Sequence, residues 1–314
     1  MAKKNQKDKS IKTKRGHRKG FLPALLIVII GIGGLFGWMH INASLTHLKY
    51  AEVYLDDLPE QFEGTKLLFV SDINIRNSMD ASACMKTMDK LKDLNADILL
   101  LGGDYSADTL ISSLNGGNGS GKEAYTERFI ESLTSFYTPL GKFAVSGEQD
   151  SAGISEVFSK AGVQHLSDSC TVVEKNGAKL VIAGLSDTSS GRTPFEEIGG
   201  YFNGDECVIA VAHNPSAYVG IRVAEARGGG TWVDMVLAGH TLGGQINVFG
   251  KTMFSLTEEE QRCLSGWHYT NDLPMLVSQG LGCKGLKLRF GTQSEIWCIT
   301  LHKPVGAGLV LPKL

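Results

Sequence analysis

The sequence lacks several patterns that mark common classes of protein. Its six cysteines include no pair in CxxC spacing, which argues against a zinc ribbon or a dithiol redox site. No segment repeats at a fixed period, so we expect no repeat architecture. Cys263 and Cys283 could pair if their domain lies outside the cell, and the sequence leaves this open.

Positive charge is scarce beyond the first twenty residues. That tail holds nine basic residues against one acidic residue. Removing it from the 31 basic and 33 acidic residues of the chain leaves 22 against 32, a net charge of −10. Because nucleic acids are polyanions, a domain with this balance binds them poorly, and we expect no nucleic-acid partner.

One long apolar run, residues 21–39, follows the basic tail and contains no charged residue. Its length suits a single bilayer span, and the preceding positive charge favours a cytoplasmic N-terminus with the main domain extracytoplasmic. A cleaved signal peptide is the alternative, with Asn42–Ala43–Ser44 as a poor cleavage site, but the run is long for a signal core. We therefore divide the chain into a tail (1–20), a transmembrane anchor (21–40) and one domain (41–314).

The domain combines strand-like and helix-like patterns. Helices are expected over 82–94, 123–136 and 154–161. Asn176–Gly177 predicts a hairpin turn, and the glycine-rich stretch 114–121 predicts a surface insertion or, alternatively, a lid. Strands are expected over 50–55, 66–70, 97–101, 142–145, 171–174, 180–183, 208–211, 234–237, 245–249, 275–277 and 295–301. This order fits two packed mixed sheets flanked by helices.

Five predicted strands run directly into a carboxylate or an imidazole. These side chains are Asp72, Asp104, Glu148, His213 and His240. Ligand-binding groups of α/β folds gather at the carboxyl ends of strands. Because carboxylates and imidazoles are good ligands for Mn, Fe and Zn, the pattern predicts a metal site.

The order of these motifs resembles the calcineurin-like metallophosphoesterases, whose motifs run Asp-x-His, Gly-Asp-x-x-Asp, Gly-Asn-His-Asp/Glu, a lone His and Gly-His-x-His. The resemblance covers about residues 55–301, and Gly243–Gly244–Gln245 with the stretch 278–290 is similar to the membrane-associated branch. It implies a four-layer αββα sandwich, here preceded by one transmembrane helix, and phosphoester hydrolysis at a two-metal centre.

The chain departs from the family pattern at several positions. Asn74 replaces the His of Asp-x-His, and Leu242 replaces the second His of Gly-His-x-His. In the Gly-Asn-His-Asp motif, Glu148 replaces Asn and Gln149 replaces His. The second Asp of Gly-Asp-x-x-Asp falls on Ala107. Gln149 would take the catalytic position of an acid or electrostatic stabiliser, yet an amide donates a hydrogen bond without delivering a proton.

These departures affect the two implied metals unequally. The first would use Asp72, Asn74, Asp104 and Leu242. Leu cannot bind a metal and Asn is a weak neutral ligand, so at most a weak site remains there. The second would use Asp104, Glu148, His213 and His240, all of which can bind a metal. We therefore expect one divalent ion per chain, Mn, Fe or Zn.

Two functions are compatible with this pattern. The first is a metal-dependent phosphoesterase with a degraded binuclear centre and weak activity, acting on a phosphorylated small molecule or on a lipid or envelope precursor. The second is an inactive pseudoenzyme that binds a phosphorylated ligand or a partner protein. The lost histidines favour the second, whereas the retained Asp72, Asp104, His213 and His240 favour the first. Histidines without a strand-end context, and Arg76, are not expected to be ligands.

Overall fold

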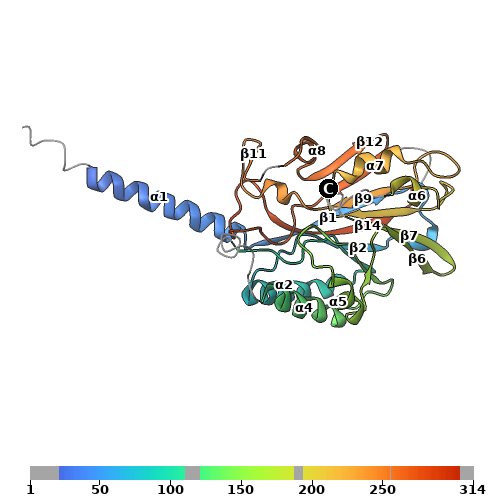
Figure 1. Cartoon of the computed structure of the whole chain (residues 1–314), viewed down its shortest axis with the longest axis horizontal. Helices are drawn as coiled ribbons and strands as arrows, with labels where there is room; N and C mark the ends of the chain where they lie inside the picture. Colours follow the sequence, from blue (N-terminus) through green and yellow to red (C-terminus); the bar gives the residue numbers. More distant parts are fainter. Residues whose placement is uncertain (1–20, 110–120, 187–193, 255, 305–314) are drawn as a thin grey trace, which may run out of the picture.

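The structure, a computed structural model, describes residues 21–109, 121–186, 194–254 and 256–304. The basic tail lies outside the described residues, as does nearly all of the stretch 114–121 that we expected to be a surface insertion or a lid. Helix α1 (Phe21–Asn42) projects from the body of the protein, and every residue from Pro23 to Trp38 is exposed (Figure 1). This helix is long and apolar enough to cross a membrane.

Two six-stranded mixed sheets form the centre of the body. In the first, β2 to β5 run parallel, and β14 pairs antiparallel with β2 and parallel with β1. Its strands, in spatial order, are β1 (Thr46–Tyr54), β14 (Ser294–His302), β2 (Lys66–Val70), β3 (Ile98–Leu101), β4 (Lys142–Ala144) and β5 (Gln164–His165).

The second sheet has a parallel centre with an antiparallel strand at each edge. Its strands, in spatial order, are β12 (Gly266–Thr270), β13 (Leu273–Val277), β9 (Met235–Ala238), β8 (Val208–Ala212), β7 (Ala178–Leu185) and β6 (Ser169–Lys175). The predicted Asn176–Gly177 turn joins β6 to β7. A separate two-stranded ribbon consists of β10 (Asn247–Val248) and β11 (Lys251–Thr252).

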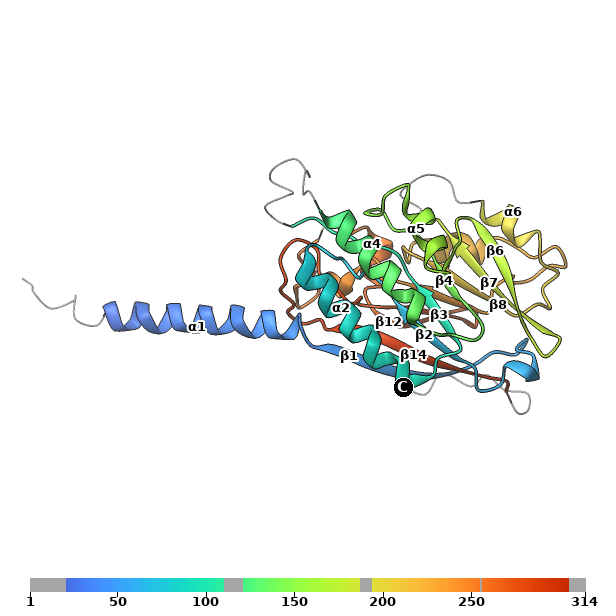
Figure 2. The same cartoon turned by 90° about the horizontal axis from the view of Figure 1, so that it is seen from below.

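Helices cover the outer face of each sheet, which produces the four αββα layers (Figures 1 and 2). The first sheet is covered by α2 (Ser78–Leu91), α4 (Lys122–Ser132) and α5 (Ile154–Lys160), and the second by α6 (Phe195–Gly199) and α7 (Ala217–Val223). A further short helix, α8 (Glu258–Arg262), precedes β12. The expected fold class is thus confirmed.

Strand β2 illustrates how the sequence produces these layers. Leu67 and Phe69 face the core between the sheets, whereas Leu68 and Val70 face the helices, as the alternation of side chains along a strand requires. All four are fully buried. A strand covered on both faces therefore reads as a continuous apolar run, which is how β2, β3, β8 and β9 are recognisable in the sequence.

Two expectations need correction, and one open question is answered. The helix expected at 82–94 begins at Ser78, because the Asn77 side chain caps it by accepting hydrogen bonds from the N–H groups of residues 79 and 80. The strand expected at 245–249 pairs only at Asn247–Val248, since Gln245 adopts a positive φ of 52° and leaves the extended conformation. Cys263 and Cys283 are unpaired, as are the other four cysteines.

Candidate metal centre

The five strand-end residues expected to bind metal lie at one edge of the two sheets. Asp72, Asp104 and Glu148 follow the adjacent strands β2, β3 and β4, and His213 and His240 follow the adjacent strands β8 and β9. The sheets are joined at this edge, because the His240 N–H donates to the Asp72 carboxylate with N–O distances of 2.9 and 3.1 Å. Parallel strand ends thus bring together side chains that are up to 168 residues apart.

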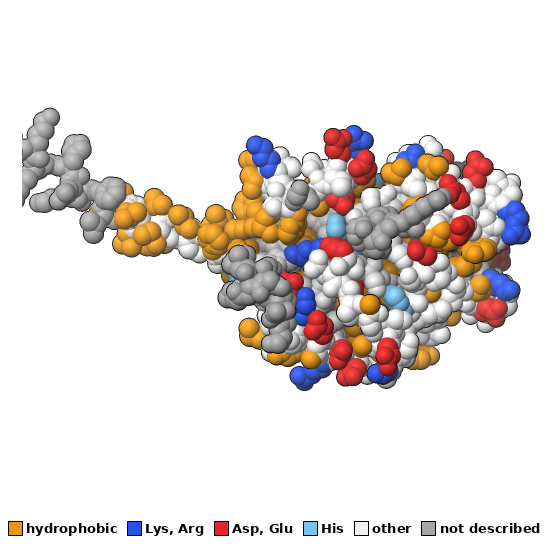
Figure 3. Space-filling view, in the orientation of Figure 1, with side chains coloured by type: hydrophobic (Ala, Val, Ile, Leu, Met, Phe, Trp, Pro, Cys, Tyr) orange, Lys and Arg blue, Asp and Glu red, His pale blue; other side chains and the backbone are white. Residues whose placement is uncertain are grey.

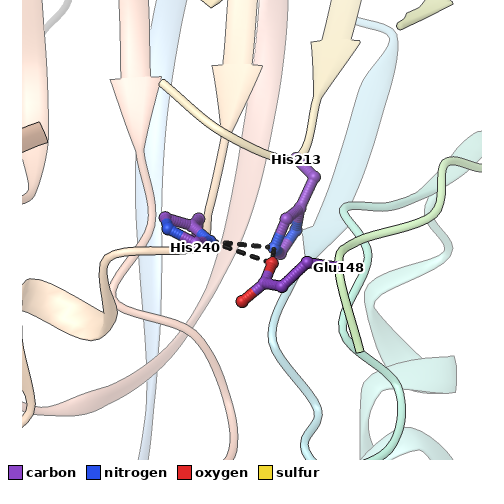
Figure 4. A group of neighbouring side chains, drawn as sticks. All are labelled: Glu148, His213 and His240. Atoms are coloured by element: carbon purple, nitrogen blue, oxygen red, sulfur yellow. Dashed lines mark hydrogen bonds and ion pairs between the residues drawn. The ribbon is translucent and has the colours of Figure 1, made fainter. Parts of the chain in front are cut away.

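Three of these side chains converge on one point. Glu148 Oε2 lies 2.9 Å from His213 Nε2 and 3.1 Å from His240 Nδ1, and the two imidazole nitrogens lie 3.3 Å apart (Figure 4). Asp104 Oδ1 is also close, 3.5 Å from His213 Nε2. His213 and Asp104 are fully buried, whereas Glu148 and His240 retain 23% and 17% of their side-chain surface, so the cluster opens to solvent on one side.

Each imidazole is fixed by its other ring nitrogen. His213 Nδ1 lies 2.7 Å from the Gly102 carbonyl and donates to it, which directs Nε2 toward Glu148. His240 Nε2 lies 3.3 Å from Glu260 Oε1, which directs Nδ1 toward the same point. Such carboxylate or carbonyl partners are typical of histidines that bind metals, because they set the tautomer and the ring orientation.

The convergent atoms fit a single ion. Ligands bonded at about 2.0–2.1 Å in tetrahedral geometry lie about 3.3 Å from one another, close to the 2.9–3.3 Å separations of Glu148, His213 and His240. A second group, formed by Asp72, Asp104 and His213, also brings its ligand atoms within 4.8 Å of one another. Carboxylates and imidazoles suit Mn, Fe or Zn.

Close packing at this edge depends on two motif glycines. A Cβ atom on Gly103 would lie 2.6 Å from His213 Nδ1, and one on Gly147 would lie 2.7 Å from His213 Nε2. Only glycine lets the backbone approach the imidazole this closely. The motif residues Asp72, Asp104 and His240 themselves adopt positive φ values of 49°, 55° and 71°. Left-handed backbone at non-glycine residues is unfavourable and concentrates at functional sites.

The replaced residues occupy the Asp72 side of the centre. Asn74 is buried and donates to the Asp72 carbonyl through Nδ2, while its Oδ1 has no hydrogen-bond donor among the described residues. Leu242, in a short 3-10 helix (Leu242–Gly244), is fully buried. It borders Gly280, as Asp72 does. One flank of Asp72 is therefore apolar where the family has a second histidine.

A lysine also enters the centre. Lys284 Nζ lies 2.8 Å from Asp104 Oδ2 and also contacts Glu148 Oε1, and its side chain is 20% exposed. Burial alone would lower the pKa of Lys284, but the carboxylates of Asp104 and Glu148 outweigh this effect and raise it. The ammonium group is therefore charged at physiological pH.

The charges of the cluster support one another. Burial would raise the pKa of Glu148, yet hydrogen bonds to His213 and His240 hold it far below its usual range. Burial would lower the pKa of His213, but Asp104 and Glu148 raise it. A metal that binds His213 must therefore displace the proton on Nε2.

Asp150 fixes the loop that carries Glu148. Its carboxylate accepts hydrogen bonds from the N–H groups of Asp104, Tyr105 and Gly147. Gln149 takes part through its backbone, since its N–H donates to Asp104 Oδ1 at 3.1 Å. Sequence reasoning missed the roles of Lys284, Glu260 and Asp150. Of these three residues, only Asp150 could have been found from the sequence, because it is the last residue of the stretch that corresponds to the Gly-Asn-His-Asp motif.

Comparison with known proteins identifies relatives along most of the chain, although no protein-family model matches it. A "Transmembrane protein with metallophosphoesterase domain" from Danio rerio is 23% identical over 303 residues, which cover 91% of this chain and 63% of that protein. The "Uncharacterized metallophosphoesterase YkuE" from Bacillus subtilis is 22% identical, with 92% and 97% covered. The "Phosphodiesterase YaeI" from Escherichia coli is 24% identical, with 86% and 94% covered.

The chain spans just under two thirds of the zebrafish protein and nearly all of the two bacterial proteins. Among solved structures, a dimetal phosphatase from Danio rerio aligns with 69% of this chain and 88% of its own, with a TM-score of 0.44 and 8% identity. The relatives match 86–92% of this chain, and their names support its resemblance to the calcineurin-like metallophosphoesterase family.

Proposed function

We propose that this protein is a membrane-anchored phosphoesterase that works with one divalent ion, Mn, Fe or Zn. Its ligands would be Asp104, Glu148, His213 and His240. The observation that supports this most directly is the convergence of Glu148 Oε2, His213 Nε2 and His240 Nδ1 at separations of 2.9–3.3 Å. Asp72 and Asn74 flank the ion site without joining this convergent group.

The chain's own residues prepare the site for an anionic substrate. When bound, a divalent ion supplies Lewis-acid polarisation of a phosphoryl oxygen and a nucleophile at neutral pH. His213, oriented by the Gly102 carbonyl, and His240, oriented by Glu260, would direct one ring nitrogen each at the ion, once it has displaced the proton on His213 Nε2. Gln149 stands where the family has a proton donor, so the leaving group receives no proton there and we expect weak hydrolysis.

We further propose that the substrate lies at the membrane surface, as a lipid or an envelope precursor would. The end of α1 packs on the segment that follows Lys284: Asn42 Nδ2 donates to the Thr292 carbonyl at 2.9 Å, and Trp38 contacts the Phe290 ring edge-on with centroids 5.7 Å apart. The apolar surface of α1 continues onto the adjoining end of the body (Figure 3). Apolar side chains exposed in this part of the sequence are Val248, Phe249, Met253 and Leu286.

The proposed topology follows the charge of the chain. The basic tail (1–20) would remain in the cytoplasm, residues 21–40 would span the membrane once, and the domain at 41–314 would be extracytoplasmic. A helix packed against the domain, rather than joined to it by a loose linker, would hold the metal centre at a fixed height above the bilayer.

A catalytically inactive protein that binds a phosphorylated ligand or a partner protein is the second candidate. The observation that favours it is the replacement of the family histidines by Leu242 and Gln149, beside a cluster that keeps its charge. Such a protein would retain the ion and the anion site but would not turn over.

One experiment separates these functions. The full-length chain is purified in detergent, incubated with Mn²⁺, freed of excess metal and analysed by elemental mass spectrometry and with bis(p-nitrophenyl) phosphate. One ion per chain together with Mn²⁺-dependent hydrolysis is the expected result. One ion without hydrolysis would favour the binding protein, and no ion after incubation would contradict both the metal site and the phosphoesterase function.

A further inference from the structure

Lys284 lies inside the candidate metal centre rather than on its rim. Its ammonium group contacts one oxygen of Asp104, at 2.8 Å, and one oxygen of Glu148. Asp72 also acts on it electrostatically. Lysine is strongly hydrated and is seldom buried without paired charges. A lysine that inserts between the Asp104 and Glu148 carboxylates is therefore a built feature of the site.

Asp104 and Glu148 each face two directions. Asp104 Oδ1 lies 3.5 Å from His213 Nε2, whereas its Oδ2 faces Lys284. Glu148 Oε2 faces both imidazoles, whereas its Oε1 contacts Lys284. Each carboxylate thus directs one oxygen to the imidazoles and the other to the lysine. The pair therefore creates two neighbouring positions that favour positive charge, one beside the imidazoles and one at the Lys284 ammonium group.

We propose that the Lys284 ammonium group is the permanent second cation of this centre, so that the site combines one divalent ion with one lysine. This inference rests on the proposed function for the divalent ion itself. It adds that the second position, on the Asp72 side, is filled by the protein. Asn74 and Leu242 replace two of the ligands that the resemblance implies for a second metal, so that position keeps Asp72 and Asp104 but binds a metal only weakly while the lysine is present.

The formal charges agree with this arrangement. Asp72, Asp104 and Glu148 carry a total charge of −3 when ionised, and they all act on Lys284. One divalent ion and one ammonium group supply +3, which neutralises the cluster. Two divalent ions together with the lysine would supply +5 and leave buried positive charge without a partner, which is costly in a low-dielectric site.

The loop that carries Lys284 is held rigidly. Gln245, fully buried, accepts a hydrogen bond from the Lys284 N–H and donates to the carbonyls of Lys284 and Leu286. Arg289, also fully buried, donates to the carbonyls of Gln279, Gly280 and Gly282 from the same loop. The position of the lysine is thus fixed by the buried side chains of Gln245 and Arg289, which hydrogen-bond to the backbone of its loop.

This position gives Lys284 a role toward the substrate. An ammonium group has three N–H donors, and the contacts described here engage two carboxylates. Because the side chain is 20% exposed, the third donor can reach an anionic phosphoryl oxygen that enters from solvent. The lysine would then perform the charge-stabilising task of a second metal, without that metal's ability to ionise water.

The first test replaces Lys284 by methionine, which keeps the length of the side chain and removes its charge. Full-length wild type, Lys284→Met and the control Lys287→Met are dialysed against excess Mn²⁺, and bound metal and melting temperature are measured with Mn²⁺ and with EDTA. Lys287 is a suitable control because its Nζ faces Asp80, at 3.5 Å, outside the centre. We expect one ion per chain in wild type and control, but two in Lys284→Met.

The melting temperatures provide a second readout. In EDTA, Lys284→Met should melt below wild type because the Asp104 and Glu148 carboxylates lose the ammonium group that they both contact, and Mn²⁺ should raise its melting temperature more than that of wild type. Two ions in wild type, or one ion in Lys284→Met with an unchanged response to Mn²⁺, would overturn the inference. Absence of metal from wild type would instead overturn the proposed function.

A second experiment does not depend on how well the variant folds. Wild-type protein is treated with acetic anhydride, and modification of each lysine is followed by mass spectrometry with and without Mn²⁺. Lys284 should be acetylated at least about tenfold more slowly than Lys287 under both conditions, because its ammonium group stays paired. Rapid acetylation of Lys284, or acceleration by Mn²⁺, would show that the lysine leaves the centre and would overturn the proposal.

Discussion

The neighbouring strands β8 and β9 have ionisable groups, buried or partly buried, near their carboxyl and amino ends, and the two ends differ. At the carboxyl ends, His213 and His240 meet Glu148. At the amino ends, Asp234 precedes β9, and its Oδ2 accepts a hydrogen bond of 2.7 Å from the Val208 N–H at the start of β8. The same pair of strands thus offers an internal comparison between a candidate site and a structural carboxylate.

The difference lies in the partners. At the carboxyl ends, imidazoles, carboxylates and a lysine compensate one another and point at common positions. At the amino end, burial raises the pKa of Asp234 to about 7, and the neighbouring carboxylate of Asp57 adds to the effect. A perturbed pKa marks both ends, so it does not identify a site by itself. The candidate metal centre differs because its donor atoms converge on one point and its two imidazoles are each oriented by an outer hydrogen-bond partner.

The largest effect is expected from His213→Ala at the carboxyl end. This change removes the fully buried imidazole that lies between Glu148 and Asp104. Bound Mn²⁺ should fall to near zero, and any hydrolysis of bis(p-nitrophenyl) phosphate should drop by at least about 100-fold. Elemental analysis and a phosphodiesterase assay measure both, with circular dichroism to confirm that the variant folds.

The matched control for that experiment is His302→Ala. His302, at the end of β14, pairs with Glu63 rather than with any residue of the centre. It should retain wild-type metal content and hydrolysis. If His213→Ala kept its ion, the convergence seen at the carboxyl ends would have no functional meaning and the contrast between the two strand ends would collapse.

A smaller effect is expected from Glu260→Gln. Glu260 is a positioning residue: its Oε1 faces His240 Nε2 at 3.3 Å and accepts a hydrogen bond from Asn214, while its Oε2 closes the capping box with Thr257. The amide keeps the shape but loses the charge that holds the imidazole. Mn²⁺ affinity should fall by about tenfold, with little change in the melting temperature in EDTA.

Glu258→Gln is the control, because Glu258 lies on the same short helix with its side chain exposed and its partner is Arg262. Isothermal titration of each apo protein with Mn²⁺ provides the measurement. Equal affinities for Glu260→Gln and Glu258→Gln would mean that Glu260 serves the helix cap alone.

Much of this centre could be predicted from the sequence because the relevant geometry is local. A buried strand appears as an apolar run, and the residue after it lies at the strand's carboxyl end whatever the rest of the fold does. Asp72, Asp104, Glu148, His213 and His240 were accessible by that rule, and the sheets do bring them together.

Lys284 and Glu260 were not accessible, because each reaches the centre from a loop or short helix whose position depends on tertiary contacts. Lys284 is placed by the Gln245 and Arg289 hydrogen bonds, and Glu260 by its contact with Asn214. The Gln245 hydrogen bonds also explain why the strand predicted at 245–249 is wrong. The expected strand began at Gln245, whereas the Gln245 side chain is fully buried and bonded to backbone groups 39 and 41 residues away.

The smallest effect is expected at the amino end of β9, from Asp234→Asn. The pKa of Asp234 rises on folding from about 3.9 in an unfolded chain to about 7, so the folded state binds more protons in this interval. Wild-type stability should therefore be greatest below pH 4 with respect to this group and should decline as pH rises to 7.

Asparagine can still accept the Val208 N–H and carries no charge, so Asp234→Asn should flatten this decline. At pH 8 it should raise the free energy of unfolding by on the order of 1 kcal/mol, with no change in bound Mn²⁺. Urea unfolding at pH 5 and pH 8 measures the first effect, and elemental analysis the second. A stability gain without any change at the metal centre would show that the two ends of β9 are energetically separate. Loss of metal in Asp234→Asn would show that they are coupled through the strand, and that a buried carboxylate at the amino end helps to set the geometry of His240.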